Sequence, residues 1–578
     1  MTEPMDRRKF LKRSGLIIGV GAVAPTVLAA CGDDEPAATT AAAPATTQAP
    51  ATTAAMAEET PDTTAAMEET TTTAMMADAP AEFESITLAQ VAGWISLDSN
   101  RTTGGALSTG QHTFEGLLIK LPDRSLIPGL ATEMPRQVDD LTYRVKIRTD
   151  RTFSDGTPIK ASDIVYGYDR LDPERELGSP FTQYITFIES IDIIADDELQ
   201  INLNQRTPED VLFQRISAIK AYPEAVVEEM GGMDYSFSPT PSSGSMMVVA
   251  PFDTELNVFQ RYDGYTGPQP LAAKDITYVA IPELASRIAQ VEAGQAQILD
   301  GVSPQLYRAI EDSPNLNLGI ARQTSFLEMI MMNTTKPPFD NQLVRQALMY
   351  SIDAQELIDI GLQGEGRIAR SPLPPEDPRY IEPQQQYNFD PEKSKALLRE
   401  AGYDPDNEPV QFQLGVVEWA YVYPQAPLFA QRMQDGGFDP LLLVDSIDAR
   451  WVSDIMKPEG GGPARYDAWV ATIGFEVFSY DADGLFRGWW SGWAENASFS
   501  TPGVPAKLDE FLNAALEEPD FDKQNELYAQ ANEILVTEAG AVPILFQPIA
   551  HAWNKSVAGY QMPQTLGMTL FGVHPSGE

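Results

Sequence analysis

The side chains that most often carry catalysis or bind metals are scarce in this sequence. His112, His551 and His574 lie far apart, without the spacing of metal ligands, and Cys31 is the only cysteine. A lone cysteine excludes a disulfide within the chain and a thiolate metal cluster. The motifs G-x-S-x-G and H-E-x-x-H and the P-loop are missing, and no nucleophile stands near a histidine. We therefore predict no metal, no cofactor and no catalytic residue, and a protein that is not an enzyme.

Acidic side chains are abundant. The chain contains 83 aspartates and glutamates against 40 lysines and arginines, and its formal charge is −43. Carboxylate pairs of the glycosidase kind arise by chance among so many acids, so a hydrolase is the alternative from a different class. The negative charge argues against nucleic acid as a partner, because nucleic-acid-binding proteins present basic patches. It also opposes contact with anionic lipid, so membrane attachment has to be covalent or inserted.

Cys31 offers a covalent attachment, because the sequence L-A-A-C that ends at this residue resembles the bacterial lipobox. Its thiol would carry a diacylglyceryl group, and two acyl chains make a stable anchor. The paired Arg7 and Arg8 form a twin-arginine export signal. Residues 14–30 are weakly apolar and glycine-rich, which suits the core of a signal peptide better than a membrane span. We predict a signal peptide over residues 1–30 and lipid attachment at Cys31.

Residues 31–82 are predicted to be the lipid anchor and a disordered linker. From Gly32 to Glu82 the sequence consists mainly of Ala, Thr, Pro, Met and acids, with ten acidic residues and no Lys or Arg. Such a segment cannot bury enough apolar surface to offset the entropy of ordering it. As a coil it would span roughly 40 Å, which would tether a folded body near the membrane.

Beyond the linker, strand and helix signals alternate. Residues 141–148 alternate apolar and polar side chains as a half-buried strand does, and a helix is expected after the turn at 153–158, behind Ser162 and Asp163. The other predicted elements are a strand at 276–281 with a helix ending at Gly294, a helix from Pro391 capped by Asp390 and ended by Gly402, and strands at 411–417 and 441–444 flanking a helix at 427–433. This alternation predicts an α/β body with mixed sheets covered by helices.

Four stretches of the body resemble the family 5 extracytoplasmic solute-binding proteins of ABC importers, the group that binds oligopeptides, dipeptides and nickel. In family order they are 129–166 with L-T-Y-R-V-K-I-R-T-D-R-T-F-S-D-G-T-P-I-K, 333–353 with N-T-T-K-P-P-F-D-N-Q-L-V-R-Q-A-L, 387–403 with Y-N-F-D-P-E-K-S-K-A-L-L-R-E-A-G-Y, and 541–550 with A-V-P-I-L-F-Q-P-I-A. We interpret these motifs as scaffold. Asp340 is expected to cap a helix whose apolar side faces a core, and Arg345 to form a structural ion pair.

The resemblance implies a two-lobed, clam-like fold of the periplasmic-binding-protein kind. The first lobe would comprise residues 83–323 and 546–578, with a subdomain at about 125–246, and the second lobe residues 324–545. The chain would cross the hinge near 319–326 and return near 541–547. The solute would be enclosed between the lobes.

Aromatic residues of the second lobe are candidates for the solute-binding wall, because they offer large contact area at low entropic cost. Six of the eight tryptophans fall there, and we assign ligand contact to Trp451, Trp469, Trp489 and Trp490. Trp451 lies in S-I-D-A-R-W, which resembles the family stretch whose tryptophan reaches the ligand.

The acid that anchors a peptide amine in the family follows a G-W pair, and this sequence departs from that pattern. If Gly474 and Phe475 stand for the pair, Phe478 occupies the place of the acid. Aligned without a gap from Asp467, Glu476 falls there instead. We assign Phe475 and Glu476 to the ligand site and leave both alignments open.

The resemblance implies a lipoprotein that captures a small solute, most simply a peptide, and delivers it to an ABC importer. Its partners would be the solute, the permease and ATPase subunits, and the membrane through Cys31, with the protein itself a monomer. Its place would be the outer face of the cytoplasmic membrane, in the cell envelope. The alternatives are a sensor subunit of the same fold and an importer component for another solute, such as a sugar.

Overall fold

The computed structural model describes residues 82–94, 96–98, 110–171, 185–231, 235, 237–324, 326–417, 425–445, 466–473, 481–490, 504–564 and 567–577. The chain divides into two compact units, residues 1–75 and 76–578, and every described residue belongs to the second unit. The predicted signal peptide, Cys31 and nearly all of the predicted linker therefore lie outside the described residues.

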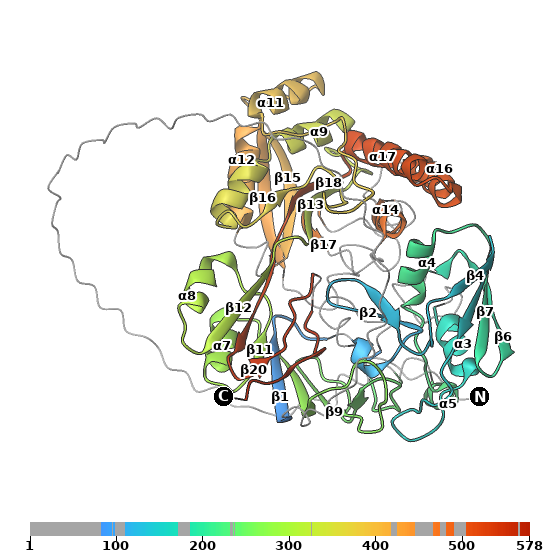
Figure 1. Cartoon of the computed structure of the whole chain (residues 1–578). Coiled ribbons are helices and arrows are strands. Elements are labelled where there is room, and N and C mark those ends of the chain that lie inside the picture. The colour runs from blue at the N-terminus through green and yellow to red at the C-terminus, as the bar shows by residue number, and fades with distance from the viewer. Residues whose placement is uncertain are drawn as a thin grey trace, which may run out of the picture. The chain divides into compact units, whose positions relative to one another are not determined.

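A seven-stranded mixed sheet, called the first sheet here, has the strand order β12-β19-β11-β1-β10-β9-β8 (Figure 1). Its strands are β1 (Phe83–Gln90), β8 (Met246–Val248), β9 (Leu256–Arg261), β10 (Ala273–Ala280), β11 (Ile298–Leu299), β12 (Leu316–Ala321) and β19 (Ile549–Asn554). Ile86 and Leu88 of β1 enter one buried cluster, and Ala89 enters another. Helices α7 (Leu284–Glu292) and α8 (Tyr307–Glu311) contribute to the second cluster, so both faces of the sheet are covered.

A six-stranded mixed sheet, called the second sheet, has the order β14-β18-β13-β17-β15-β16. Its strands are β13 (Leu327–Met332), β14 (Arg367–Ile368), β15 (Val410–Val417), β16 (Phe438–Asp445), β17 (Ala468–Ile473) and β18 (Ala541–Phe546). Helices α9 (Gln342–Tyr350), α11 (Pro391–Glu400) and α12 (Ala426–Asp435) pack on one face. Helices α14 (Ala482–Trp490), α16 (Val504–Glu517) and α17 (Phe521–Glu538) share the buried cluster of the other face.

A four-stranded antiparallel sheet of order β4-β5-β7-β6 forms the centre of a subdomain. The subdomain consists of β4 (Arg136–Asp139), β5 (Thr142–Lys146), β6 (Ile188–Ala195), β7 (Glu198–Leu203), α3 (Ala161–Asp169), α4 (Glu209–Ile216) and α5 (Glu224–Met230). Its buried Tyr143 and Leu199 belong to the same apolar cluster as Met329 of β13 and Trp469 of β17. The subdomain therefore shares one core with the second sheet.

The remaining elements are short connectors. They are the pairs β2 (Leu118–Lys120) with β3 (Leu126–Pro128) and β20 (Val557–Ala558) with β21 (His574–Pro575), the 3₁₀ helix η2 (Pro304–Leu306), helix α10 (Ala354–Glu356) and the π-helical turn η3 (Leu357–Gly361). Among the described residues, no helix combines the length and the apolar composition needed to cross a membrane.

The local sequence signals predict most of these elements well. Asp390 caps α11 by accepting a hydrogen bond from the backbone N–H of Lys393, and Gly402 ends the helix region with a φ of 94°. The strand and helix predicted at 276–281 and up to Gly294 are β10 and α7. The α/β fold with mixed sheets is confirmed.

Two details of the prediction are wrong. Asn341, not Asp340, caps α9, because its side chain accepts from the N–H of Leu343. Leu141 is 41% exposed and precedes β5, because its N–H bonds the Asp139 carboxylate in the turn before the strand. Apolar alternation locates a strand but does not fix its first residue.

Arg345 is a structural residue, as predicted. Its side chain is buried, donates to the backbone oxygens of Glu538 and Phe339 at 2.8 and 2.9 Å, and pairs with the Glu538 carboxylate at 3.3 Å. One guanidinium thereby connects α9 to the end of α17.

We expect Arg345→Met to lower the free energy of unfolding by about 3 kcal/mol, because several acceptors lose a buried donor. Urea unfolding measures this value. Arg308→Met is the matched control, since Arg308 is exposed and its ion pair with Asp312 spans 3.9 Å; it should change the value by no more than about 0.5 kcal/mol. Equal effects of both substitutions would contradict the structural role of Arg345.

Candidate functional site

Two connections carry the chain between the first and second sheets, and together we call them the crossing. One leads from Ala321 at the end of β12 to Leu327 at the start of β13, and the other from Phe546 of β18 to Ile549 of β19. The connections bond each other: the Gln547 N–H donates to the Phe326 carbonyl at 2.8 Å, and the Thr324 hydroxyl donates to the Gln547 carbonyl. The two connections of the crossing are therefore bonded to each other and are not independent linkers.

The second sheet turns the carboxyl ends of its parallel strands toward the crossing. Strands β15, β16 and β17 run parallel, so they end at the same edge of the sheet. At that edge Ile473, the last residue of β17, pairs with Leu327, the first residue of β13.

The first sheet does the same. Strand β1 is parallel to β10 and β11, and β11 and β12 are both antiparallel to β19. All four strands β1, β10, β11 and β12 therefore run in one direction. Ala321, the last residue of β12, pairs with Ile549 at the crossing. In open α/β sheets, ligands bind outside the carboxyl ends of parallel strands, so this shared edge is the candidate functional site.

Only part of the predicted site falls within the described residues. Trp451, Phe475 and Glu476 lie outside them, as does Phe478. Trp489 and Trp490 end helix α14, without a description of their side chains. In the sequence, however, Phe475 and Glu476 follow the last residue of β17 by two and three positions, and Trp451 follows the last residue of β16 by six.

Trp469 is the predicted site residue that the structure describes in full. It pairs with Met331 across β17 and β13, and its side chain is 2% exposed. The ring lies in the apolar cluster that the subdomain shares with the second sheet. Trp469 is therefore a buried residue of that core.

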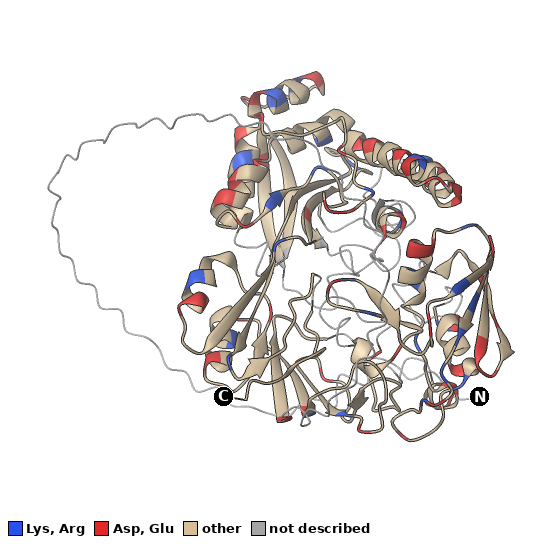
Figure 2. Cartoon of the chain, in the orientation of Figure 1, with Lys and Arg blue, Asp and Glu red and all other residues tan. Residues whose placement is uncertain are grey.

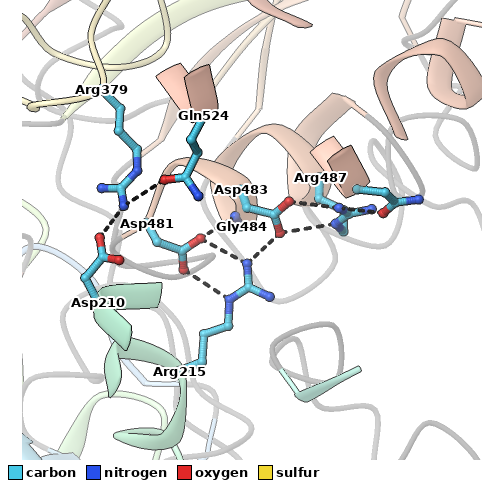
Figure 3. Close-up of polar contacts among 9 residues, drawn as sticks. Asp210, Arg215, Arg379, Asp481, Asp483, Gly484, Arg487 and Gln524 are labelled. Atoms are coloured by element: carbon cyan, nitrogen blue, oxygen red, sulfur yellow. Dashed lines mark hydrogen bonds and ion pairs between the residues drawn. The ribbon is translucent and has the colours of Figure 1, made fainter. Parts of the chain in front are cut away.

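Ion pairs connect the subdomain to the second sheet, and we call Arg215, Asp481, Asp483, Arg379 and Asp210 the clasp (Figure 3); within the clasp, Asp210 is exposed and the other four side chains are buried. Arg215 of α4 donates to Asp481 at 3.0 and 3.2 Å and to Asp483 at 2.6 Å. Arg379 donates to Asp210 of α4 and lies 3.5 Å from the Gln524 side-chain oxygen on α17. The clasp joins segments that are more than 150 residues apart in the chain.

The charges of the clasp support one another. Burial disfavours the charge on Arg215, but the carboxylates of Asp481 and Asp483 outweigh it and raise the pKa of the guanidinium above its ordinary value. Burial also disfavours the Asp483 carboxylate, yet Arg487 and Arg215 hold its pKa below the usual range. By contrast, Glu510 of α16 and Asp522 and Glu526 of α17 are exposed; acidic segments along these two helices are coloured red in Figure 2. Asp483 thus stays ionised while buried.

Sequence reasoning missed the clasp and a buried acid on β13, Glu328. The signal for the clasp was D-A-D at 481–483, at the start of a helix, where carboxylates stabilise the helix N-terminus. The signal for Glu328 was an acid inside the apolar run L-E-M-I-M-M of residues 327–332. Neither sequence pattern indicates which residues these acids contact.

The described residues hold no group of three or more His, Cys, Asp or Glu side chains that could bind a metal ion. Of the three histidines, His112 and His551 are buried, and burial lowers their pKa values to about 4 and about 3. Both are therefore neutral core residues.

Two sheets joined by a paired crossing, with strand ends from both converging on it, define the class of two-lobed periplasmic binding proteins. Residues 125–447, more than half of the chain, match the model of the bacterial extracellular solute-binding proteins, family 5 Middle. The chain belongs to this family and is an extracellular solute-binding protein.

Relatives of known role and solved structures agree with this assignment. The glutathione-binding protein GsiB of Escherichia coli strain K12 is 25% identical over 509 residues, which cover 85% of this chain and 95% of that protein. The dipeptide-binding protein of Pseudoalteromonas sp. SM9913, in complex with Met-Leu, matches with a TM-score of 0.76 and 18% identity over 85% of this chain and all of that one. The ABC transporter-associated periplasmic binding protein DppA of Helicobacter pylori, in complex with the peptide STSA, matches with a TM-score of 0.75 and 19% identity over 86% and 98%. These relatives are binding proteins, which agrees with a role in binding rather than catalysis.

The clasp leads to a prediction about how the subdomain docks. Arg215→Met leaves Asp481 and Asp483 buried without their shared cation, which is strongly unfavourable. We expect the variant to release the subdomain from the second sheet and to increase the radius of gyration measured by small-angle scattering, with unchanged far-UV circular dichroism.

Arg206→Met is the control for this experiment, because Arg206 donates only an exposed hydrogen bond to the Glu517 carbonyl at 3.3 Å. Its radius should equal that of the wild type. The same radius in both variants would mean that the shared apolar core, and not the clasp, fixes the subdomain.

Proposed function

We propose that this protein captures a short peptide between its two lobes and delivers it to the permease and ATPase subunits of an ABC importer. The observation that carries the proposal is the meeting of parallel-strand carboxyl ends from both sheets at the crossing. A solute at this edge would touch both lobes, so binding would select the closed arrangement. The relatives that bind glutathione, Met-Leu and STSA support a peptide rather than another solute class.

The first and second sheets fall in different proposed lobes, and the subdomain of the proposed first lobe packs against the second sheet. The first lobe comprises residues 83–323 and 546–578, including the subdomain at about 125–246, and the second lobe residues 324–545. The solute-binding wall is proposed to include Trp451, Phe475 and Glu476 together with Trp469, Trp489 and Trp490. Trp451, Phe475 and Glu476 belong to segments that follow the carboxyl ends of β16 and β17, which supports the choice. We propose that the protein works as a monomer.

Direct titration tests the proposed substrate class. Isothermal titration calorimetry with Met-Leu, STSA and glutathione should detect binding of at least one of them. Mass spectrometry of material released from the purified protein by mild denaturation should find a peptide. If the protein binds none of the three and the released compound is a sugar, the proposed substrate class would change from a peptide to a neutral solute.

Trp451 and Glu476 are expected to act differently on binding. Trp451→Ala should weaken the binding of every solute, because the area that stacks on the ring does not depend on the charge of the solute. Glu476→Gln should weaken solutes with a free amine by roughly ten- to a hundredfold and leave N-acetylated peptides unchanged, because it removes a charge and keeps the shape. Calorimetry of both variants measures these effects. Unchanged affinity in both would place the binding wall elsewhere.

We propose that the protein is exported through the twin-arginine route and anchored by lipid at Cys31. The charge of −43 gives the body no attraction to anionic lipid, so the anchor alone would hold it at the outer face of the cytoplasmic membrane.

Cys31→Ser should release the folded protein from the membrane fraction, and Arg7→Lys/Arg8→Lys should block its export. Cell fractionation with an immunoblot measures both outcomes. A Cys31→Ser protein that still sediments with membranes at high salt would contradict the lipid anchor, and continued export of the double variant would contradict the twin-arginine route.

A further inference from the structure

Two buried side chains, Glu328 and Gln547, and the half-buried Thr472 lie beside the crossing, and each has a buried atom that lacks a hydrogen-bond partner among the described residues. The atoms are Oε1 of Glu328, Oε1 of Gln547 and Oγ1 of Thr472. Glu328 and Gln547 are both 0% exposed. Buried polar atoms in native proteins almost always have partners, so three orphans in one place indicate a missing ligand group or water.

Backbone pairing brings the three side chains together. Glu328 of β13 and Thr472 of β17 are direct partners in an antiparallel ladder, so their side chains share one face of the sheet, with Cβ atoms about 5 Å apart. The Nε2 of Gln547, on the returning connection, donates to Oε2 of Glu328. Glu328 therefore lies between the two other polar side chains. We call these three residues the polar triad.

The triad lies at the proposed binding edge. Glu328 is the second residue of β13, Thr472 the last but one of β17, and Gln547 directly follows β18. All three stand where β17 ends and the chain crosses between the sheets. Trp469 pairs with Met331, three positions along each strand from the pair of Thr472 with Glu328. Because successive side chains of a strand point to opposite faces, Trp469 faces the other side of the sheet. The triad is thus separate from the apolar core that contains Trp469.

The orphan atoms specify the chemistry of the missing group. A carboxylate oxygen and an amide oxygen only accept hydrogen bonds, and a threonine hydroxyl can accept one. A buried carboxylate also needs a positive partner to stay ionised. An ammonium group supplies three N–H donors and one positive charge, which matches three acceptors of which one is an acid.

We propose that Glu328, with Thr472 and Gln547, binds the ammonium group of the solute. The inference rests on the proposed function and adds to it a carboxylate from the hinge strand. It applies under either alignment of the family's amine anchor, because Glu328 lies outside the G-F-E-V-F segment at 474–478. The triad would give solutes with a free amine a higher affinity than solutes without one.

The triad also predicts a pH dependence. Burial raises the pKa of Glu328 to about 8, and the bond from Gln547 opposes this only in part. The two described arginines of the neighbouring elements pair with other acids: Arg367 with Glu376 at 2.5 Å, with a further bond to the Thr324 carbonyl at 2.8 Å, and Arg322 with Glu365 at 2.6 Å. Glu328 is therefore largely protonated at pH 7 and has to release its proton when an ammonium binds.

The sign of the effect follows from this linkage. Well below the pKa, each pH unit increases the ionised fraction of Glu328 about tenfold, so affinity for an amine should rise about tenfold from pH 6 to pH 7. Binding at pH 7 should release close to one proton per solute. Calorimetry in two buffers of different ionisation enthalpy counts that proton.

The experiment compares Met-Leu with N-acetyl-Met-Leu on the full chain. In the wild type, Met-Leu should bind with the pH dependence above, and the acetylated peptide should bind more weakly and without it. Glu328→Gln should weaken Met-Leu by roughly ten- to a hundredfold at pH 7, abolish proton release and leave N-acetyl-Met-Leu unchanged. Thr472→Val should weaken Met-Leu by a smaller factor and keep the proton release.

Two control variants keep the result specific. Glu365→Gln removes another acid of this region and should change neither affinity nor proton release. Glu476→Gln, which is expected above to weaken the binding of amine-bearing solutes, leaves the triad intact and should keep the pH dependence and the proton release. A thermal melt of Glu328→Gln checks that it folds, which we expect because a neutral amide replaces a neutral acid of the same shape.

The outcomes separate the triad from the proposed function. If the wild type binds Met-Leu and Glu328→Gln binds it with the same affinity and proton release, the triad holds water and the inference is overturned, while the proposed function stands. If the wild type binds neither Met-Leu, STSA nor glutathione, the peptide proposal and the triad fall together.

Discussion

The hydrogen bond between the Gln547 N–H and the Phe326 carbonyl ties together the only two connections that the described residues show between the sheets. Because the Thr324 hydroxyl bonds the same residue, the two connections form one hydrogen-bonded unit. Each sheet has to place a strand end at this unit, and strand direction then brings the carboxyl ends of the neighbouring parallel strands to the same edge. The position of the binding edge is thus a consequence of how the chain crosses.

The subdomain adds a second constraint. Its apolar core continues into that of the second sheet, and the clasp places charged groups inside this contact. Apolar burial is not directional, whereas the fork of Arg215 fits its two carboxylates in one geometry only. The core therefore supplies attraction and the clasp fixes orientation. In a protein that is proposed to close its lobes on a solute, a fixed orientation matters as much as stability.

The parts of this fold that depend on near neighbours could be predicted from the sequence. Caps such as Asp390 and strands such as β10 depend on residues that are only a few positions apart in the sequence. The clasp and the polar triad could not be predicted in this way, because their members are 266 and 219 residues apart. A single sequence shows that Glu328 is an unusual acid in an apolar strand, but its partners depend on which strands pair. The same limit applies to the choice between Glu476 and Phe478, which depends on the register after β17.

The central claim is that a solute binds at the edge where the two sheets meet. Hydrogen–deuterium exchange with and without Met-Leu tests it most directly, because it reports protection along the whole chain. The account predicts slower exchange in peptides covering residues 91–98, 322–328, 471–480 and 545–549, and unchanged exchange in α11 and in the outer turns of α16. Protection confined to helices away from the crossing, with none at residues 322–328 and 545–549, would contradict it.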